Sequence, residues 1–590
     1  MAKNIFLLLL VLLLTNICIS AQSSAPKAKP NVVLILIDDL SHYGVTAYGA
    51  NRVSSLRGDF ENETIATPNI DKLAETGLMC TNAFAYPLCE PTRIALMSGK
   101  YNQRNFLRCK AQHSSDITFG DVFKQQGYAT GLFGKWKQSR GTKEIPGKDY
   151  VFEFGWDEFC AFDIVTEGKR FINPNLIVNG EIRDYQLRTD LDPETGRRWY
   201  GPDICNRYAL NFIEKNKDKP FFLYYPMLLV HDEHQPTPDT RPKKLFDEFD
   251  EGRNAQNKKK GDDRRYFPDM ISYMDKLIGR VVGKLDELNL RENTLIVVMG
   301  DNGTKECFAH VFPDGKVYPG RKGGNTDNGL HVPMVLNQPG IIKAGNMGIR
   351  KYDGLVDVTD VFPTIAEASG IEIPGKNELD GISFWPQVMG NKEEARDVIY
   401  TWYNNNQPYT SDEELLVYAF NKDFKRYAPC TEYPNGRFFD LRTDSLEKAG
   451  DTVVERRFKV MLHSGLDVSV LSMEQRKAYD KLGKVIDSYQ QKDVKGLMIH
   501  APKSALKPGE ELNLNCMVYP QDATRKNIIW ESSNSSVIDI NKFGKVKALS
   551  KGKATISVYS WDDAFPVSAN AKPTFSKSGI SHSIEITVDE

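Results

Sequence analysis

The residues from Cys89 to Arg93 combine a nucleophile and a cation at a spacing that suits a tetrahedral anion. Pro91 favours the start of a helix, because the amide hydrogen that proline lacks would have no partner there. Cys89 would lie at the positive end of the helix dipole, and Arg93, four residues on, would share its face. These features suit sulfate or phosphate oxygens. A buried structural cysteine is the alternative interpretation.

Four apolar runs, each typical of a strand buried in a parallel sheet, end in polar side chains. The runs cover residues 31–37, 127–134, 220–230 and 294–300. The groups that follow them are Asp38-Asp39, Lys135-Trp136-Lys137, His231 to His234 and Asp301-Asn302. Ligands of open α/β sheets bind beyond the carboxyl ends of the strands, so we expect these side chains to gather in one crevice.

The acidic and amide groups among them predict a cation site. Asp38 and Asp39 would repel each other and lose water at the end of a buried strand, so a cation should lie between them. A helix cap or an exposed turn is the alternative. Together with Asp301 and Asn302 they offer oxygen donors and no histidine, which selects Ca²⁺ or Mg²⁺ over Zn²⁺. Several carboxylates and an amide suit the larger, looser shell of Ca²⁺.

The pattern Cys-x-Pro-Thr-Arg, followed by a short helix and Gly99, resembles the signature of type I sulfatases in the alkaline-phosphatase superfamily. The resemblance covers about residues 31–490 and implies that Cys89 is oxidised to formylglycine. It further implies that Asp38, Asp39, Asp301 and Asn302 bind one Ca²⁺, with the oxidised Cys89 as another ligand. The maturation partner would be a formylglycine-generating enzyme or an anaerobic sulfatase-maturating enzyme.

The same resemblance implies roles for other polar residues. Lys135 matches the lysine of a Gly-Lys-Trp motif, and Lys322, within 321–324, matches a second sulfate-binding lysine. With Arg93 they would offset charge on the sulfuryl oxygens. His231 would protonate the departing alcohol oxygen as general acid. Two further histidines are candidate substrate-binding residues. His331 takes the place of a residue often near the sugar, and His234 could donate the proton instead of His231, although Pro236 and Pro238 after it suggest a loop role.

Formylglycine suits repeated sulfate transfer better than a thiol does. Its hydrate offers two hydroxyl groups, of which one attacks sulfur and the other later expels the sulfate. The metal would lower the pKa of the hydroxyl, and Asp301 could take its proton. Lys137 stands where many family members have histidine. Crowded by cations it could act as a base, or it could only contact the anion or substrate.

Segments with the periodicity of a helix lie between the apolar runs. They are residues 69–77, 119–126, 204–215 and 270–288. Alternating strands and helices predict an α/β fold with a large, mostly parallel sheet sandwiched by helices. The resemblance to type I sulfatases implies that this fold is alkaline-phosphatase-like. The densely charged run 243–265 is expected to be a solvated helix or loop.

A chain of 590 residues should divide into two to four domains. We expect a catalytic α/β domain at 31–390 and a smaller α+β subdomain at 396–490. Alternating runs separated by turn signals predict an all-β sandwich at 497–590. With the segments 530–534 and 543–546, this last part resembles the bacterial Ig-like group 2 domains.

Charge, hydropathy and cysteine content indicate the class of partner, the cellular location and the disulfide content. A formal net charge of -2 argues against a nucleic-acid partner. Residues 1–21 are typical of an export signal, and no later run is long enough for a transmembrane helix. The protein is thus expected in the periplasm or outside the cell, with a lipid anchor at Cys18 as the alternative. Without Cys18 and Cys89, seven of nine cysteines remain, with no repeating spacing typical of a disulfide scaffold.

Export and the Ig-like part point to a sulfated polysaccharide or oligosaccharide as substrate. The aromatic residues 199, 200, 402, 403 and 409 could stack on sugars, although core positions are more common for them. A phosphate or phosphonate monoester hydrolase is the nearest alternative, against which the oxygen-only ligand set weighs. A non-catalytic carbohydrate-binding protein, with an unmodified thiol at Cys89, is the other.

Overall fold

The computed structural model describes residues 29–106, 111–139, 147–165, 168–257, 259–346, 348–375, 378–404, 415–430, 433–456, 460–561 and 579–589. The expected export signal, Cys18 and Tyr409 lie outside the described residues. Within the described ranges, no helix has both the length and the apolar character needed to cross a bilayer.

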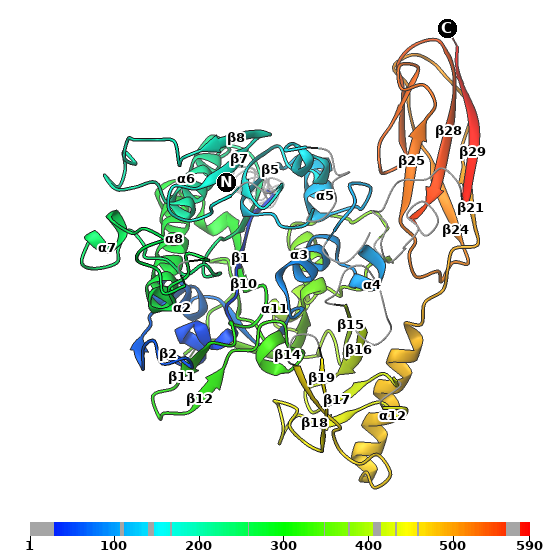
Figure 1. Ribbon diagram of the computed structural model, residues 1–590. Coiled ribbons are helices and arrows are strands. Elements are labelled where there is room, and N and C mark those ends of the chain that lie inside the picture. The colour runs from blue at the N-terminus through cyan, green and yellow to red at the C-terminus, as the bar shows by residue number, and fades with distance from the viewer. Residues whose placement is uncertain are drawn as a thin grey trace, which may run out of the picture.

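A ten-stranded mixed sheet forms the centre of the larger part of the molecule (Figure 1). Its order is β14-β4-β13-β10-β1-β9-β5-β6-β7-β8. Strand β1 is parallel to both of its neighbours, β9 and β10, and β5 is parallel to β9. The carboxyl ends of these four strands therefore meet at one edge. The strands are β1 (Asn31–Ile37), β4 (Leu78–Phe84), β5 (Ala129–Lys135), β6 (Glu158–Phe162), β7 (Asn175–Val178), β8 (Glu181–Asp184), β9 (Phe221–Pro226), β10 (Thr294–Gly300), β13 (Met334–Asn337) and β14 (Lys351–Asp357).

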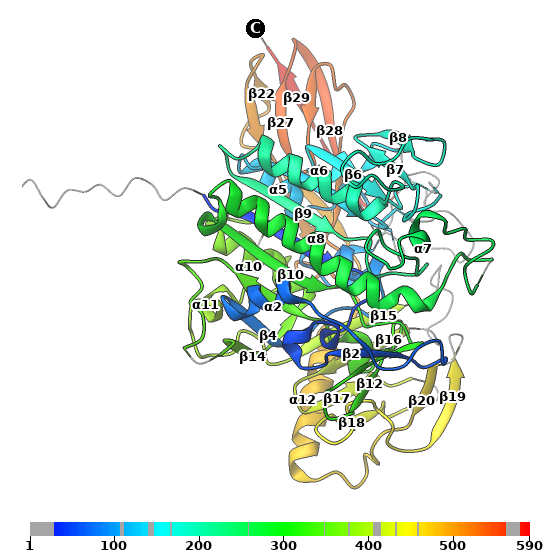
Figure 2. The same ribbon diagram turned by 90° about the vertical axis from the view of Figure 1, so that its left-hand side faces the viewer.

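Helices cover both faces of this sheet, which confirms the predicted fold class. Successive side chains of β1 point to opposite faces. Val33, Ile35 and Ile37 belong to one core, with residues of α2 (Pro68–Glu75), α6 (Gly201–Lys215) and α8 (Phe267–Glu287). Val32, Leu34 and Leu36 belong to the other, with α3 (Cys89–Ser98), α5 (Phe119–Gln125) and α10 (Val361–Ala368). Figure 2 shows α6 and α8 in front of the sheet.

The charged run 243–265 is only partly the solvated segment that its composition predicts. It contains the short helix α7 (Lys244–Asp247) and exposed turns. Asp262 and Asp263 are buried in it, however, because each carboxylate accepts hydrogen bonds from a neighbour. The other short helices are α4 (Asn102–Asn105), α9 (Asp327–Leu330) and α11 (Trp385–Val388).

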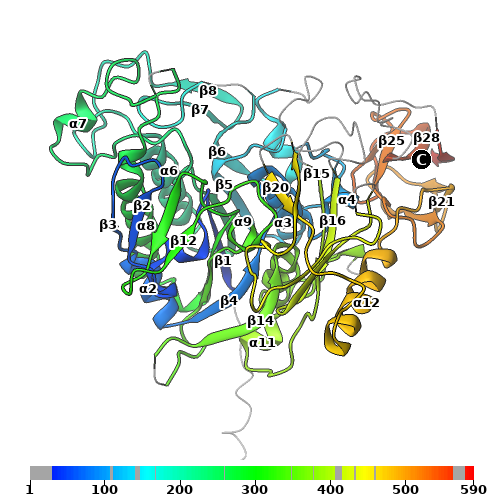
Figure 3. The same cartoon turned by 60° about the horizontal axis from the view of Figure 1, so that its bottom comes forward.

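Two smaller four-stranded sheets accompany the large sheet. One has the order β12-β11-β2-β3 and joins β2 (Arg52–Ser55), β3 (Glu63–Thr64), β11 (Phe308–Val311) and β12 (Val317–Pro319). The other is antiparallel, with β15 (Ile399–Asn404), β16 (Leu415–Phe420), β17 (Phe424–Tyr427) and β18 (Phe438–Asp440). Helix α12 (Met473–Ser488) packs against β16 and β17, and β19 (Thr452–Arg456) pairs with β20 (Val460–His463) (Figure 3).

The last part of the chain is all β and has its own hydrophobic core. Alternate residues of β28 are buried, as expected where one face of a strand covers a core. Its strands are β21 (Gly496–His500), β22 (Ala505–Leu506), β23 (Glu511–Asn513), β24 (Asn515–Tyr519), β25 (Ile528–Ser532), β26 (Ile538–Ile540), β27 (Lys545–Ala548), β28 (Gly552–Ser560) and β29 (Ser581–Val588).

This all-β part is docked on the residues around α5. The ammonium group of Lys542 donates to the Asp121 carboxylate at 2.8 Å and to the carbonyl oxygens of Ser114, Asp116 and Glu153 at 2.9, 3.1 and 2.7 Å. The indole Nε1 of Trp561 donates to Ser115 Oγ at 2.7 Å. A cation with four protein acceptors is fixed in place, so the contact is specific.

Candidate active site

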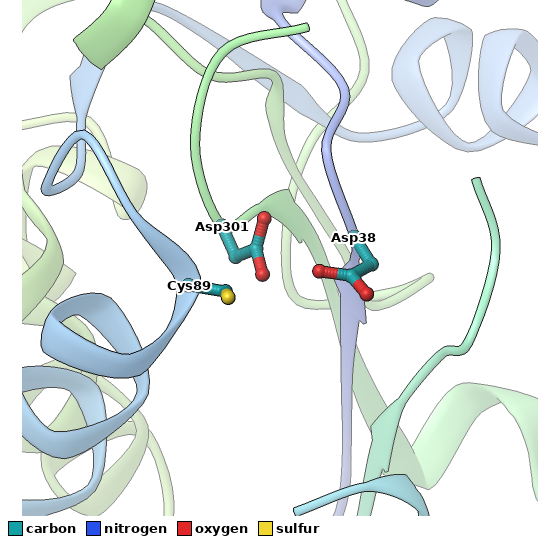
Figure 4. Close-up of side chains that lie close together, drawn as sticks. All are labelled: Asp38, Cys89 and Asp301. Carbon is teal, nitrogen blue, oxygen red and sulfur yellow. The ribbon is translucent and has the colours of Figure 1, made fainter. Parts of the chain in front are cut away.

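Three potential ligand groups point into one space at the edge of the main sheet. Asp38 follows β1, Asp301 follows β10, and Cys89 begins α3 (Figure 4). One ligand atom of each lies within 4.8 Å of the others. Asp39 turns the chain here with a left-handed φ of 63°, and its amide donates to Asp301 Oδ1 at 3.0 Å.

Helix α3 holds Cys89 against the end of β10. The sequence predicts a helix that begins beside Cys89. In the structure Cys89 is its first residue and Pro91 its third, where proline is still tolerated because the first-turn amides need no helical partner. All ten residues of the helix are buried. The Thr92 hydroxyl donates to the carbonyl oxygen of Asp301 at 2.7 Å, which ties the helix start to the strand end.

The expected sulfate-binding cations all reach the carboxylates. Arg93 Nη2 donates to Asp301 Oδ2 at 2.9 Å and to Asp38 Oδ1 at 3.3 Å. Lys135 Nζ donates to Asp38 Oδ2 at 2.6 Å, and Lys322 Nζ donates to Asp39 Oδ2 at 2.5 Å. The side chains of Arg93, Lys135, Asp38 and Asp301 have no exposed surface. Such buried charges persist only when paired, and here three cations match three carboxylates.

The four predicted metal ligands fit a hard divalent cation. Asn302 Nδ2 donates to Asp39 Oδ1 at 2.9 Å. Its Oδ1 is buried and accepts no hydrogen bond within the described part of the chain, which leaves a lone pair for a cation. Burial and the charge of Asp38 raise the pKa of Asp301 well above its usual value. Carboxylates this crowded are stabilised by a further positive charge.

Cys89 is a protected thiol in this environment. Its Sγ donates to Glu90 Oε2 at 3.1 Å, and 1% of the residue is exposed. Burial and the neighbouring Glu90 carboxylate raise the pKa of Cys89 to about 11. The unmodified side chain is therefore a neutral thiol at pH 7, and a weak nucleophile.

Lys137 lies at the same site, but its surroundings do not favour the base role. Its Nζ lies 3.8 Å from Glu90 Oε1 and 3.9 Å from Asp163 Oδ2. Burial lowers its pKa, but the neighbouring acidic groups of Cys89, Glu90 and Asp163 outweigh this effect and raise it. Its carboxylate neighbours keep Lys137 charged, which suits contact with an anion.

His231 connects two groups of charged residues. Its Nε2 lies 3.0 Å from Lys322 Nζ and 3.7 Å from Asp39 Oδ2. Its Nδ1 lies 2.7 Å from Asp232 Oδ1, and Lys305 Nζ donates to Asp232 Oδ2 at 2.6 Å. Burial and the nearby lysines lower the pKa of His231 to about 4. The imidazole is thus neutral here, with Lys322 as the proton donor on Nε2.

The other two predicted histidines have ring nitrogens bonded to protein groups. His331 directs Nδ1 toward Asp327 Oδ1 at 3.1 Å and Nε2 toward the carbonyl oxygen of Thr81 at 2.8 Å. Both ring nitrogens are thus occupied by protein groups. His234 is 1% exposed, and its Nδ1 lies 2.7 Å from Asp262 Oδ1. Substrate contact by a ring nitrogen of His331 would require one of its bonds to break, and contact by Nδ1 of His234 would require loss of its bond to Asp262.

Three residues at the site escaped the sequence reasoning, and a fourth, Asp232, is expected in the crevice but without a role. Glu90 lies inside the Cys-x-Pro-Thr-Arg pattern and Lys305 follows Asp301 by four residues, so proximity could have indicated these two. Arg170, whose Nη1 lies 3.2 Å from His231 Nδ1, belongs to no recognisable motif.

Backbone contacts explain how Lys135 and Lys322, the two lysines expected to bind sulfate, are held. Before Lys135, Gly134 has a φ of 137°, and a Cβ there would lie 1.9 Å from the carbonyl oxygen of Pro226, so only glycine fits. The amides of Lys322 and Gly323 donate to the carbonyl oxygens of Thr304 and Pro87, at 2.9 and 2.8 Å. The Lys322 loop therefore lies against the residues just before Cys89.

Buried cations, acidic side chains and a potential nucleophile at one sheet edge define an ester hydrolase that acts on tetrahedral anions. A family model described as sulfatase matches residues 30–371, more than half of the chain. The chain belongs to the sulfatase family and is a sulfuric ester hydrolase. A second model, the bacterial Ig-like domain (group 2), matches residues 493–569. Both resemblances inferred from the sequence are confirmed.

Known proteins of the same family share moderate similarity with the chain. Human arylsulfatase D is 25% identical over 63% of this chain and 71% of its own. A sulfatase of Formosa agariphila is 25% identical over 75% of this chain and 92% of its own. The solved structure of BT4656, in complex with its substrate D-glucosamine-2-N,6-O-disulfate, is 18% identical, with a TM-score of 0.55. It covers 78% of this chain and 97% of its own. This likeness shows a shared fold.

Proposed function

We propose that the protein removes sulfate from sulfated polysaccharides or their oligosaccharide fragments, after conversion of Cys89 to formylglycine. The observation that carries the proposal is the buried arrangement of three carboxylates and three cations beside Cys89. Unmodified Cys89 is a poor nucleophile in this setting, whereas the hydrate of formylglycine supplies a hydroxyl group for attack on sulfur.

Each residue around the formylglycine hydrate has a separate role in the proposed reaction. Arg93, Lys135 and Lys322 bind the sulfuryl oxygens and offset the charge that develops on them. Asp301 accepts a proton at its carboxylate, and Lys137 contacts the bound anion. His231 is the general acid in this proposal: its ring is neutral without substrate, and the negative charge of a bound sulfate ester would raise its pKa so that Nε2 gains the proton that it gives to the leaving alcohol oxygen. Asp232 orients the ring through Nδ1.

The proposed cofactor is one Ca²⁺, held by Asp38, Asp39, Asp301, Asn302 and the modified residue 89. When bound, it would lower the pKa of a coordinated hydroxyl group. The oxygen-only donor set and the unsatisfied Asn302 Oδ1 support this choice.

A sulfated sugar is proposed as substrate because the related BT4656 takes one. We further propose the division into a catalytic domain (31–390), a subdomain (396–490) and an Ig-like domain (497–590), preceded by an export signal (1–21). An exported enzyme with an Ig-like domain would meet polysaccharides in the periplasm or outside the cell. The enzyme that matures Cys89 would be its other partner.

Parallel assays test the proposed function. Protein from a host with the maturation machinery is expected to hydrolyse 4-nitrophenyl sulfate faster than 4-nitrophenyl phosphate, because the oxygen-only ligand set lacks the histidines that a two-zinc phosphatase site needs. It should also release inorganic sulfate from at least one of carrageenan, chondroitin sulfate or heparin oligosaccharides. Faster turnover of the phosphate, or no release from any glycan, would reject the proposal.

Chelation tests the calcium assignment. Treatment with EGTA is expected to abolish sulfatase activity and to lower the melting temperature, because the buried carboxylates lose their shared cation. Added Ca²⁺ should restore both quantities, and equimolar Mg²⁺ should restore them less well. The control is an Asn302→Leu variant, which should need a higher Ca²⁺ concentration for the same recovery. Full activity after exhaustive chelation would contradict the assignment.

A further inference from the structure

A cavity lies beside the Lys322 loop, on the side of the smaller subdomain. It has a volume of about 440 Å³, within the range of small-molecule sites. One wall is formed by Arg321, Gly324 and Asn325 of the loop, and the other by residues around β17, β18 and β20. Arg321 of this wall directly precedes Lys322, which reaches Asp39, so the cavity and the site share one loop.

Basic side chains outnumber acidic ones in the cavity lining. The five basic residues are Arg57, Arg321, Arg437, Lys448 and His463. The two acidic residues are Glu306 and Glu447. Glu447 is already engaged, since Lys425 Nζ donates to it at 2.7 Å and the Tyr427 hydroxyl at 2.6 Å. The cavity therefore has an excess of positive charge over the single remaining carboxylate.

Arg437 is the cation of this lining whose burial and contacts most favour anion binding. It is 4% exposed, and its guanidinium group lies 3.7 Å from the centre of the Tyr427 ring. Its Nη1 donates to the carbonyl oxygen of His463 at 3.3 Å. Among the described residues it forms no ion pair with a carboxylate. A buried guanidinium group without a counter-ion is costly, so an anion in the cavity would gain a strong partner.

The cations nearer the surface are also available for a ligand. Arg57, Arg321 and Lys448 have no ion pair with a carboxylate in the described ranges of the chain. The side chains of Leu56 and Leu416 add apolar surface to the same lining. Charged groups beside small apolar surfaces are what an anionic sugar, with its polar substituents and CH faces, would contact.

We infer that this cavity binds a second anionic group, a sulfate ester or a carboxylate, on the sugar unit next to the one that is desulfated. The inference rests on the proposed glycan sulfatase function. It makes the enzyme selective for glycans with at least two negative charges on neighbouring sugars. Arg437 would be the buried anchor of the anion, with Arg321 and Lys448 completing its surroundings.

Calorimetry on the full chain tests the inference. A Cys89→Ala variant, which cannot turn over the ligands, is titrated with maltotriose, trigalacturonate and sulfated maltotriose. We expect an anionic trisaccharide to bind at least about tenfold more tightly than neutral maltotriose. Adding Lys448→Ala or Arg321→Ala should weaken that binding by about threefold to tenfold. The matched control Lys477→Ala, an exposed lysine on α12, should leave it unchanged.

Each outcome decides a separate point. Preference for trigalacturonate would identify a carboxylate as the ligand, and preference for sulfated maltotriose would identify a sulfate ester. Equal binding of maltotriose, or equal effects of Lys448→Ala and Lys477→Ala, would overturn the inference. Turnover of 4-nitrophenyl sulfate by the mature protein is measured alongside, so that loss of the proposed function and loss of this binding site are told apart.

Discussion

A Cys89→Ala variant is expected to lose hydrolysis of 4-nitrophenyl sulfate by on the order of 10⁴-fold or more, the scale seen when a covalent nucleophile is removed. Alanine leaves no oxygen that could attack sulfur, whereas Arg93, Lys135 and Lys322 remain in place to bind the anion. Substrate binding, measured by calorimetry, should therefore survive the loss of turnover. The measurement compares kcat of variant and wild type, both produced with the maturation machinery.

Cys516→Ala provides the matched control for this result, because Cys516 lies in the Ig-like part, far along the chain from the site. Its kcat should equal that of the wild type. Mass spectrometry of the wild-type peptide that contains Cys89 should show a decrease of about eighteen mass units, as thiol becomes aldehyde. An active enzyme with an unmodified Cys89, or an active Cys89→Ala variant, would refute the nucleophile assignment.

A His231→Asn variant is expected to distinguish substrates by their leaving groups. A positioned proton donor contributes about 10²-fold to 10⁴-fold to a rate, and this contribution is needed most when the departing oxygen is basic. Release of sulfate from a sugar should thus fall by about a hundredfold or more, and that from 4-nitrophenyl sulfate by less than about tenfold. The ratio of the two kcat values, variant against wild type, is the quantity to measure.

The matched control for His231 is His234→Asn, three residues further along, whose ring contacts Asp262 instead of the site. It should change stability more than it changes the ratio of the two rates. An equal loss on both substrates in His231→Asn would show that the residue helps to bind the anion and does not protonate the leaving group.

Much of the fold could be predicted because the relevant signals are local. The apolar runs before Asp38 and Asp301 have the length and composition of buried strands, and they are β1 and β10 in the structure. The antiparallel strands within the large sheet could not be foreseen, because pairing depends on contacts between segments far apart in sequence. Strand β13, for example, pairs antiparallel with both β10 and β4.

The site was predictable where its residues belong to short sequence motifs. Arg93 and Lys135 form ion pairs with Asp38 or Asp301, and Lys322 forms one with Asp39. The Cys89 thiol lies beside the carboxylates of Asp38 and Asp301. The sequence could not predict which further hydrogen-bond partners each side chain has. His331 and Asp327 lie four residues apart on one short helical turn, and only the fold shows that Thr81 occupies the second ring nitrogen.

The anchorage of Lys542 in the cage formed by Asp121 and three carbonyl oxygens constrains how the protein would work on a solid surface. A domain on a flexible linker leaves the catalytic part free to adopt many orientations. A domain that is fixed to the catalytic part determines the orientation of that part. If the Ig-like part adheres to a cell wall or a gel, Cys89 and the groups around it keep one fixed orientation relative to that surface.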